Sequence, residues 1–90
     1  TLNKDRRNRL EKVLDKLEDI KSDLEELKTD IEDIKDEEQE AYDNMPESLQ
    51  YSEKGENMQE NVESLESALN EDFEEAIDNA IYYIQEAIDR

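Results

Sequence analysis

Eight aliphatic residues in the first half of the chain follow one another in alternating steps of three and four. The series is Leu10, Val13, Leu17, Ile20, Leu24, Leu27, Ile31 and Ile34, with Leu14 as one apolar addition. This spacing fills the a and d positions of four heptads, so the apolar side chains share one stripe of a helix. Nearly all the residues between them are charged. We therefore expect a first helix over residues 4–42.

The second half of the chain has a helical pattern with a different rhythm. Its apolar series is Met58, Val62, Leu65, Leu69, Phe73, Ile77, Ile81, Ile84 and Ile88. Several consecutive steps of four drift away from a strict heptad, and alanines beside the series widen the apolar face toward the C-terminus. A wide face suits a helix that contacts more than one neighbour. We expect one second helix over residues 53–88.

The stretch between the two helices, residues 43–52, contains the only proline of the chain. Pro46 disfavours helical backbone at the residue before it, so the first helix should end there. Residues 46–50 suit a short helical turn, and Ser52 is the predicted N-cap of the second helix. The apolar residues of this stretch either close the end of the bundle or contact a partner protein. They are Met45, Leu49 and Tyr51.

One glycine and one proline in 90 residues supply too few turns for a multi-stranded sheet. Two helices of similar length with a short connection predict an antiparallel hairpin. The expected fold is all-α, a single helical-hairpin domain over residues 1–90. Because one hairpin leaves each apolar stripe half covered, we expect two copies to form a four-helix bundle. The rival is a parallel coiled coil through the first helix, in which Asp23 and Asp30 would face lysines of the partner.

The 11 basic and 29 acidic residues give a net charge of −18, but the charge is unevenly distributed. Residues 1–16 carry six basic and three acidic residues, although the start of a helix favours acids. In an antiparallel hairpin, ion pairs with Glu86 and Asp89 would explain this cluster. The alternative is an anion or nucleotide site, because arginine and helix N-termini bind phosphate and tyrosine stacks on bases. Its candidate residues are Arg6, Arg7, Arg9, Tyr82 and Tyr83.

Residues 17–90 carry 5 basic and 26 acidic residues. One interpretation is a solvated face that prevents a small bundle from aggregating. The other is mimicry of a nucleic-acid backbone toward a basic groove on a host protein. Direct binding of nucleic acid is not expected, because this acidic body repels phosphates. The acidic candidates for partner binding are Glu37, Glu38 and Glu40.

Catalysis and metal binding have little support in the sequence. The absence of Cys and His excludes thiolate and imidazole chemistry, zinc sites, disulfides and di-iron bundle sites. The pairs Glu60–Glu63 and Glu75–Asp78 have the form of the acidic motifs in all-helical nucleotide pyrophosphohydrolases, but 29 acids produce such pairs by chance. We expect a non-enzyme with no catalytic residue, metal or cofactor. Without a membrane-spanning apolar run or a signal-peptide pattern, we expect a cytoplasmic location.

The most distinctive stretch is EEQEAYDNMPESLQYSEKGENMQ, residues 37–59, followed later by the closing EEAIDNAIYYIQEAID. With the acidic coiled-coil helix before it, this stretch resembles small acidic helical proteins encoded by phages and mobile elements of Gram-positive bacteria. The resemblance implies a phage accessory or counter-defence factor that acts by binding. Our first expectation is a homodimer that docks on a host protein and inhibits or modulates it. The alternatives are a sponge for a nucleotide immune signal and a structural oligomerisation module.

Overall fold

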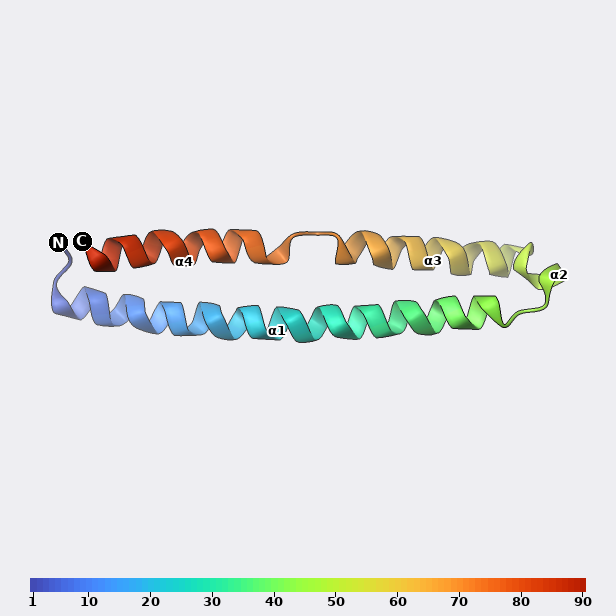
Figure 1. Ribbon diagram of the computed structural model, residues 1–90, viewed down its shortest axis with the longest axis horizontal. Helices are drawn as coiled ribbons and strands as arrows, with labels where there is room; N and C mark the ends of the chain where they lie inside the picture. Colours follow the sequence, from blue (N-terminus) through green and yellow to red (C-terminus); the bar gives the residue numbers. More distant parts are fainter. The chain divides into compact units, whose positions relative to one another are not determined.

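The computed structural model describes all residues, Thr1–Arg90, and every regular element in it is helical (Figure 1). The helices are α1 (Lys4–Asp43), α2 (Glu47–Gln50), α3 (Glu53–Leu69) and α4 (Phe73–Asp89). The predicted all-α class, the first helix and the short turn after Pro46 are confirmed. None of the four helices combines the length and the apolar character needed to cross a bilayer.

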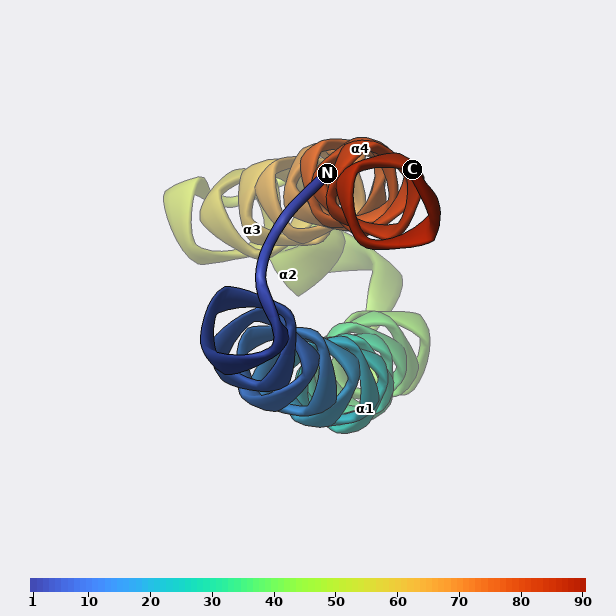
Figure 2. The same ribbon diagram turned by 90° about the vertical axis from the view of Figure 1, so that its left-hand side faces the viewer.

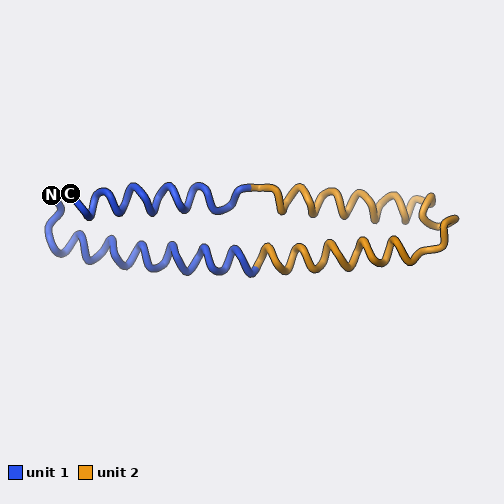
Figure 3. Tube along the Cα trace, viewed as in Figure 1, with its two compact units in different colours: residues 1–26, 72–90 blue, residues 27–71 orange.

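The chain divides into two compact units (Figure 3). Unit 1 comprises residues 1–26 and 72–90, and unit 2 comprises residues 27–71. In unit 1, α4 lies beside the N-terminal part of α1 (Figures 1 and 2). Unit 2 contains the C-terminal part of α1 together with α2 and α3.

Contacts within unit 1 pair the start of one helix with the end of the other. The Thr1 hydroxyl donates a hydrogen bond to the carbonyl oxygen of Arg90 at 3.3 Å. Further from the chain ends, Lys21 Nζ of α1 lies 2.6 Å from Asp78 Oδ1 of α4. Because residue numbers rise along α1 as they fall along α4, unit 1 is an antiparallel helix pair, as the sequence predicts.

Unit 2 has the same antiparallel order. Lys35 Nζ of α1 lies 3.9 Å from Glu66 Oε1 of α3, and Asn61 Nδ2 donates a hydrogen bond to Glu38 Oε2 at 2.9 Å. Val62 on α3 is the one buried hydrophobic side chain of the whole chain, with 6% of its surface exposed. Each unit therefore holds its helices together mainly through half-buried side chains and polar links across the pair.

Hydrogen bonds and one close backbone approach build the corner of unit 2. The side-chain amide of Gln50 donates a hydrogen bond to the backbone carbonyl oxygen of Tyr42 at 3.0 Å. The Ser52 hydroxyl donates to the backbone carbonyl oxygen of Leu49. Ser52 also caps α3, since its hydroxyl oxygen accepts the N–H of Gly55 at 3.3 Å. A Cβ on Gly55 would lie 2.7 Å from the Leu49 carbonyl oxygen, so glycine is required for this approach. The predicted cap is confirmed.

The prediction of one helix over residues 53–88 is wrong, because α3 ends at Leu69 and α4 begins at Phe73. The Asp72 carboxylate accepts the backbone N–H of Glu75 at 3.0 Å and so caps the start of α4. Such a cap satisfies an N–H group that has no partner at a helix start, which stabilises the break. The step of four from Leu69 to Phe73 therefore crosses two helices, and 40% of the Phe73 surface is exposed.

The α1 helix contacts its neighbours in both units through two of its heptad rows. Row a is Leu10, Leu17, Leu24 and Ile31; row e is Leu14, Lys21, Lys28 and Lys35; row d is Val13, Ile20, Leu27 and Ile34. Rows a and e are half-buried, whereas the row d side chains are 43% to 55% exposed. Two lysines of row e reach acidic residues of α4 and α3. The predicted partial covering of the apolar stripe is thus confirmed within each unit.

Candidate functional site

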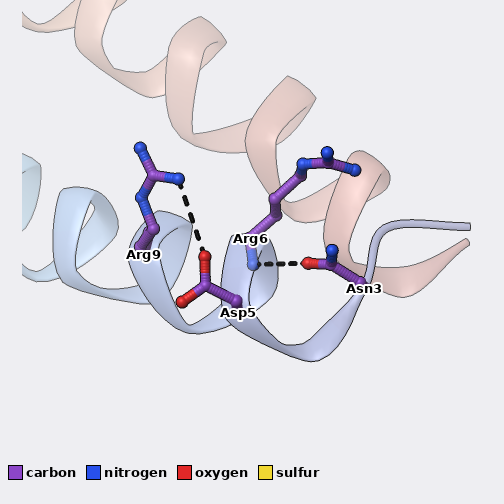
Figure 4. Close-up of polar contacts among 4 residues, drawn as sticks. All are labelled: Asn3, Asp5, Arg6 and Arg9. Carbon is purple, nitrogen blue, oxygen red and sulfur yellow. Dashed lines mark hydrogen bonds and ion pairs between the residues drawn. The ribbon is translucent and has the colours of Figure 1, made fainter.

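The N-terminal end of α1 is basic and held by a local cap (Figure 4). The Asn3 side-chain oxygen accepts the backbone N–H of Arg6 at 2.8 Å. Arg9 Nη1 lies 3.6 Å from Asp5 Oδ2, and about three-quarters of each side chain is exposed. Exposed ion pairs of this kind contribute little free energy. Arg9 can therefore exchange the Asp5 carboxylate for another anion at small cost.

Two of the predicted anion-binding arginines line one groove of unit 1. We call it the arginine groove; its volume is about 360 Å³ and it is lined by Leu2, Arg6, Arg9, Leu10 and Val13. Its lining combines three apolar side chains with two arginines. This combination suits a ligand that carries both an apolar group and a carboxylate or phosphate.

The other candidates for the anion site lie elsewhere in unit 1. Arg7, Tyr82 and Tyr83 are exposed and do not line the arginine groove. The Tyr82 hydroxyl donates a hydrogen bond to Glu86 Oε1 at 2.7 Å. This bond raises the pKa of Tyr82 above its ordinary value of 10.0, because ionisation would remove the proton that the hydroxyl donates to Glu86. The two tyrosine rings contact each other edge to face, with centroids 5.3 Å apart.

The expected ion pairs between the basic cluster and the end of α4 are not formed. Glu86 accepts the Tyr82 hydroxyl and lies 3.9 Å from Arg90 of its own helix. No ion pair joins Glu86 or Asp89 to residues 1–16. The explanation of the basic cluster through these ion pairs is therefore wrong, and the guanidinium of Arg6 forms no ion pair.

A second groove, in unit 2, is lined by two of the acidic candidates. We call it the glutamate groove; its volume is about 440 Å³ and it is lined by Ile34, Glu37, Glu38, Asn61 and Leu65. Glu38 is half-buried and accepts the Asn61 amide, whereas Glu37 is exposed. Glu40, the third acidic candidate, is exposed and lies outside the groove.

The remaining candidates are at the corner of unit 2. Met45 is half-buried, while Leu49 is 49% exposed and Tyr51 is 77% exposed. Because Leu49 of α2 and Tyr51, which follows α2, are both exposed, these two side chains do not close the end of the helix pair. They form an apolar projection on a corner whose backbone is held by hydrogen bonds.

Charge differs strongly between the units. Unit 1 carries 8 basic and 14 acidic residues, whereas unit 2 carries 3 basic and 15 acidic residues. The hydrogen bond to Asp78 raises the pKa of Lys21 in unit 1 above its ordinary value of 10.5, and nearby Glu18 and Glu74 act in the same direction. Because unit 2 has fewer basic and more acidic residues than unit 1, its surface has the stronger negative electrostatic potential.

Sequence reasoning did not assign the apolar and amide residues that complete the two grooves. A usable signal was present in the heptad register. Arg6, Arg9, Leu10 and Val13 hold positions d, g, a and d, and Ile34, Glu37 and Glu38 hold positions d, g and a four heptads later. The structure contains no cluster of three or more carboxylates positioned to hold a metal ion. No protein-family model, curated protein or solved structure matches this chain.

Proposed function

We propose that this chain is a non-enzymatic binding protein of a phage or mobile element, which acts as a homodimer in the bacterial cytoplasm. It docks on a host protein and inhibits or modulates that protein. The phage context comes from the resemblance of residues 37–59. The observation that supports docking is the exposed pair Leu49 and Tyr51 on the corner of unit 2.

Large apolar side chains held outward on a fixed backbone are typical of binding hot spots, and tyrosine is enriched among them. The hydrogen bonds of the corner reduce the conformational entropy lost on docking. Around this projection, unit 2 has a net charge of −12. The partner surface that fits it has an apolar socket with a basic rim, such as a groove that otherwise takes nucleic acid.

Capture from a host lysate with immobilised protein and mass spectrometry tests this proposal. The double variant Leu49→Ala, Tyr51→Ala is expected to weaken binding of a captured protein at least about tenfold, since hot-spot truncations cost ~2 kcal/mol. Tyr83→Ala is the matched control, because Tyr83 is 67% exposed but belongs to unit 1. Equal capture by the double variant and the wild type contradicts a docking role for the corner.

A nucleotide sponge is the second candidate function, and the arginine groove supports it. In this alternative, Arg6 and Arg9 bind phosphate oxygens and the apolar residues of the lining contact the base. Calorimetry against cyclic and linear nucleotides is the test. Arg6→Glu with Arg9→Glu should abolish the heat, whereas Arg7→Glu should preserve it because Arg7 does not line the groove. No heat at ~100 µM nucleotide from folded protein eliminates this function, because that ligand concentration detects even weak binding.

A further inference from the structure

Row d of α1 is an apolar surface that the chain itself does not cover. Its four large side chains recur every seventh residue and are 43% to 55% exposed. The whole chain buries one hydrophobic side chain, that of Val62. Domains of this size with so little buried apolar surface gain stability by oligomerisation when they have no disulfide or metal. Row d is therefore the surface of α1 where further burial contributes most.

The residues beside row d carry opposite charges at its two ends. Row g of α1 is Arg9, Lys16, Asp23, Asp30 and Glu37. All five side chains are exposed. Each lies three or four residues from a member of row d and so borders it on the helix surface. The arginine groove contains the positive end of row g, and the glutamate groove contains its negative end.

We propose that row d binds row d of a second copy, with the two α1 helices antiparallel. The inference rests on the proposed homodimer and specifies its interface. In the register that pairs all four apolar residues, Val13 faces Ile34 of the second copy and Ile20 faces Leu27 of the second copy. No member of row d remains uncovered in this register.

The same register places opposite charges together along the edge that row g forms. Arg9 meets Glu37 of the second copy, and Lys16 meets Asp30 of the second copy, each twice by symmetry. Asp23 meets its own symmetry mate, which is the one like-charge contact of row g. The guanidinium of Arg9 then exchanges the exposed Asp5 carboxylate, 3.6 Å away, for a carboxylate of the second copy. Residue Glu37 is thereby assigned to self-association, while Leu49 and Tyr51 remain available to the host protein.

A parallel arrangement is disfavoured by the same residues. With row d at its centre, it would place row g of one copy beside row a of the other, whose members are aliphatic, so the charges of row g would find no opposite charge. The lysines that would help a parallel pair belong to row e. The structure shows Lys35 of that row within 3.9 Å of Glu66 in its own chain.

Spin labels on α1 measure the orientation directly. The chain has no cysteine, so each single variant carries one label per copy. For Asp23→Cys, Lys16→Cys and Glu37→Cys, the antiparallel register predicts axial separations near zero, about 21 Å and about 42 Å, from a rise of 1.5 Å per residue. Pulsed electron paramagnetic resonance should show this increasing series. Sedimentation equilibrium on the same samples gives the mass of the assembly.

The possible outcomes separate this inference from the proposal on which it rests. A single mass of 10.7 kDa at all concentrations overturns the homodimer and the interface together. A dimer with equally short distances at all three labels leaves the homodimer intact and overturns the antiparallel orientation. A dimer whose shortest distance falls at another label overturns the register.

Charge exchange provides a second test that leaves the apolar row unchanged. Lys16→Glu turns two attractive contacts into two repulsive ones and should raise the dimer dissociation constant about tenfold at low salt. Adding Asp30→Lys to the same chain should restore it. Lys4→Glu is the control, since Lys4 lies in row b away from the interface and makes the same change in net charge. Equal weakening by Lys4→Glu and Lys16→Glu, with no restoration, overturns the proposed pairing.

Discussion

Units 1 and 2 are both antiparallel helix pairs, yet they differ in how far the residues between their helices are buried. Both buried residues of the chain, Gly55 and Val62, belong to α3 in unit 2. They are seven residues apart and share one face of that helix. In unit 1, α4 buries no residue fully, and Phe73, Tyr82 and Tyr83 are 40% to 67% exposed.

The two units also differ in how their helices are joined. In unit 2 the chain turns through α2, and glycine lets the backbone of α3 approach Leu49 and Gln50 closely. Unit 1 is joined at its open end by one hydrogen bond between the chain ends, from Thr1 to Arg90. In this chain, the buried residues therefore lie in the unit whose helices are joined by a tight connection. We expect unit 2 to be the more stable unit on this basis.

The largest effect should follow from Val62→Asp. An unpaired charge at a buried position costs about 3–5 kcal/mol, so this variant should lose most of its helical signal in circular dichroism. Ile81→Asp in unit 1 should cost less, because Ile81 is half-buried and its carboxylate can turn toward water. Equal losses for the two variants contradict the difference between the units.

Gly55→Ala tests the close approach at the corner. The added Cβ meets the backbone of Leu49 and Gln50, so the corner must shift, at a cost of about 1–3 kcal/mol for overpacking. Elsewhere in a helix, the same change would stabilise by up to ~1 kcal/mol. Chemical denaturation gives the free energy of unfolding, with Glu56→Ala at the exposed neighbour as control. A stabilised Gly55→Ala variant shows that the corner is looser than described.

Asp72→Ala removes the cap at the start of α4 in unit 1. The expected cost is about 1 kcal/mol, since the Glu75 N–H loses its acceptor. Hydrogen exchange followed by nuclear magnetic resonance should show faster exchange at Glu75 and its neighbours in α4, with α3 unchanged. Asp72→Asn is the control, because asparagine also caps helices. Unchanged exchange at Glu75 in the alanine variant would refute the cap.

The smallest effect concerns Lys21, whose ion pair with Asp78 joins the two helices of unit 1. Its pKa is raised in the folded state, so its contribution to stability is complete below pH 10.5 and is lost as pH rises through the folded pKa. Thermal melting of wild type and Lys21→Gln should differ at pH ~9 and converge as the pH rises through the raised pKa of Lys21. Lys12→Gln on an exposed surface serves as the charge-matched control. A difference between wild type and Lys21→Gln that does not decrease as the pH rises excludes the ion pair as its cause.

The sequence alone determined the helical class, the extent of α1 and the capping role of Ser52. Periodicity suffices for these features because they depend on residues within a few positions of one another. The groove residues were only partly predictable. Arg6, Arg9, Glu37 and Glu38 stand out by charge, while Asn61 joins Glu38 across 23 residues and has no local signal.

The tertiary structure decided which rows of α1 are covered and where the second helix breaks. By spacing alone, either row d or row e could face a neighbouring helix. In the structure row e faces inward, where Lys21 and Lys35 form ion pairs with carboxylates of α4 and α3. The break at Asp72 depends in part on the cap that Asp72 gives α4, and a cap of this kind contributes only about 1 kcal/mol. The exposure of Leu49 and Tyr51 was likewise undetermined until Gly55 fixed α2 against α3. Local pattern sets which faces are apolar, but the packing partners decide which of those faces remain open.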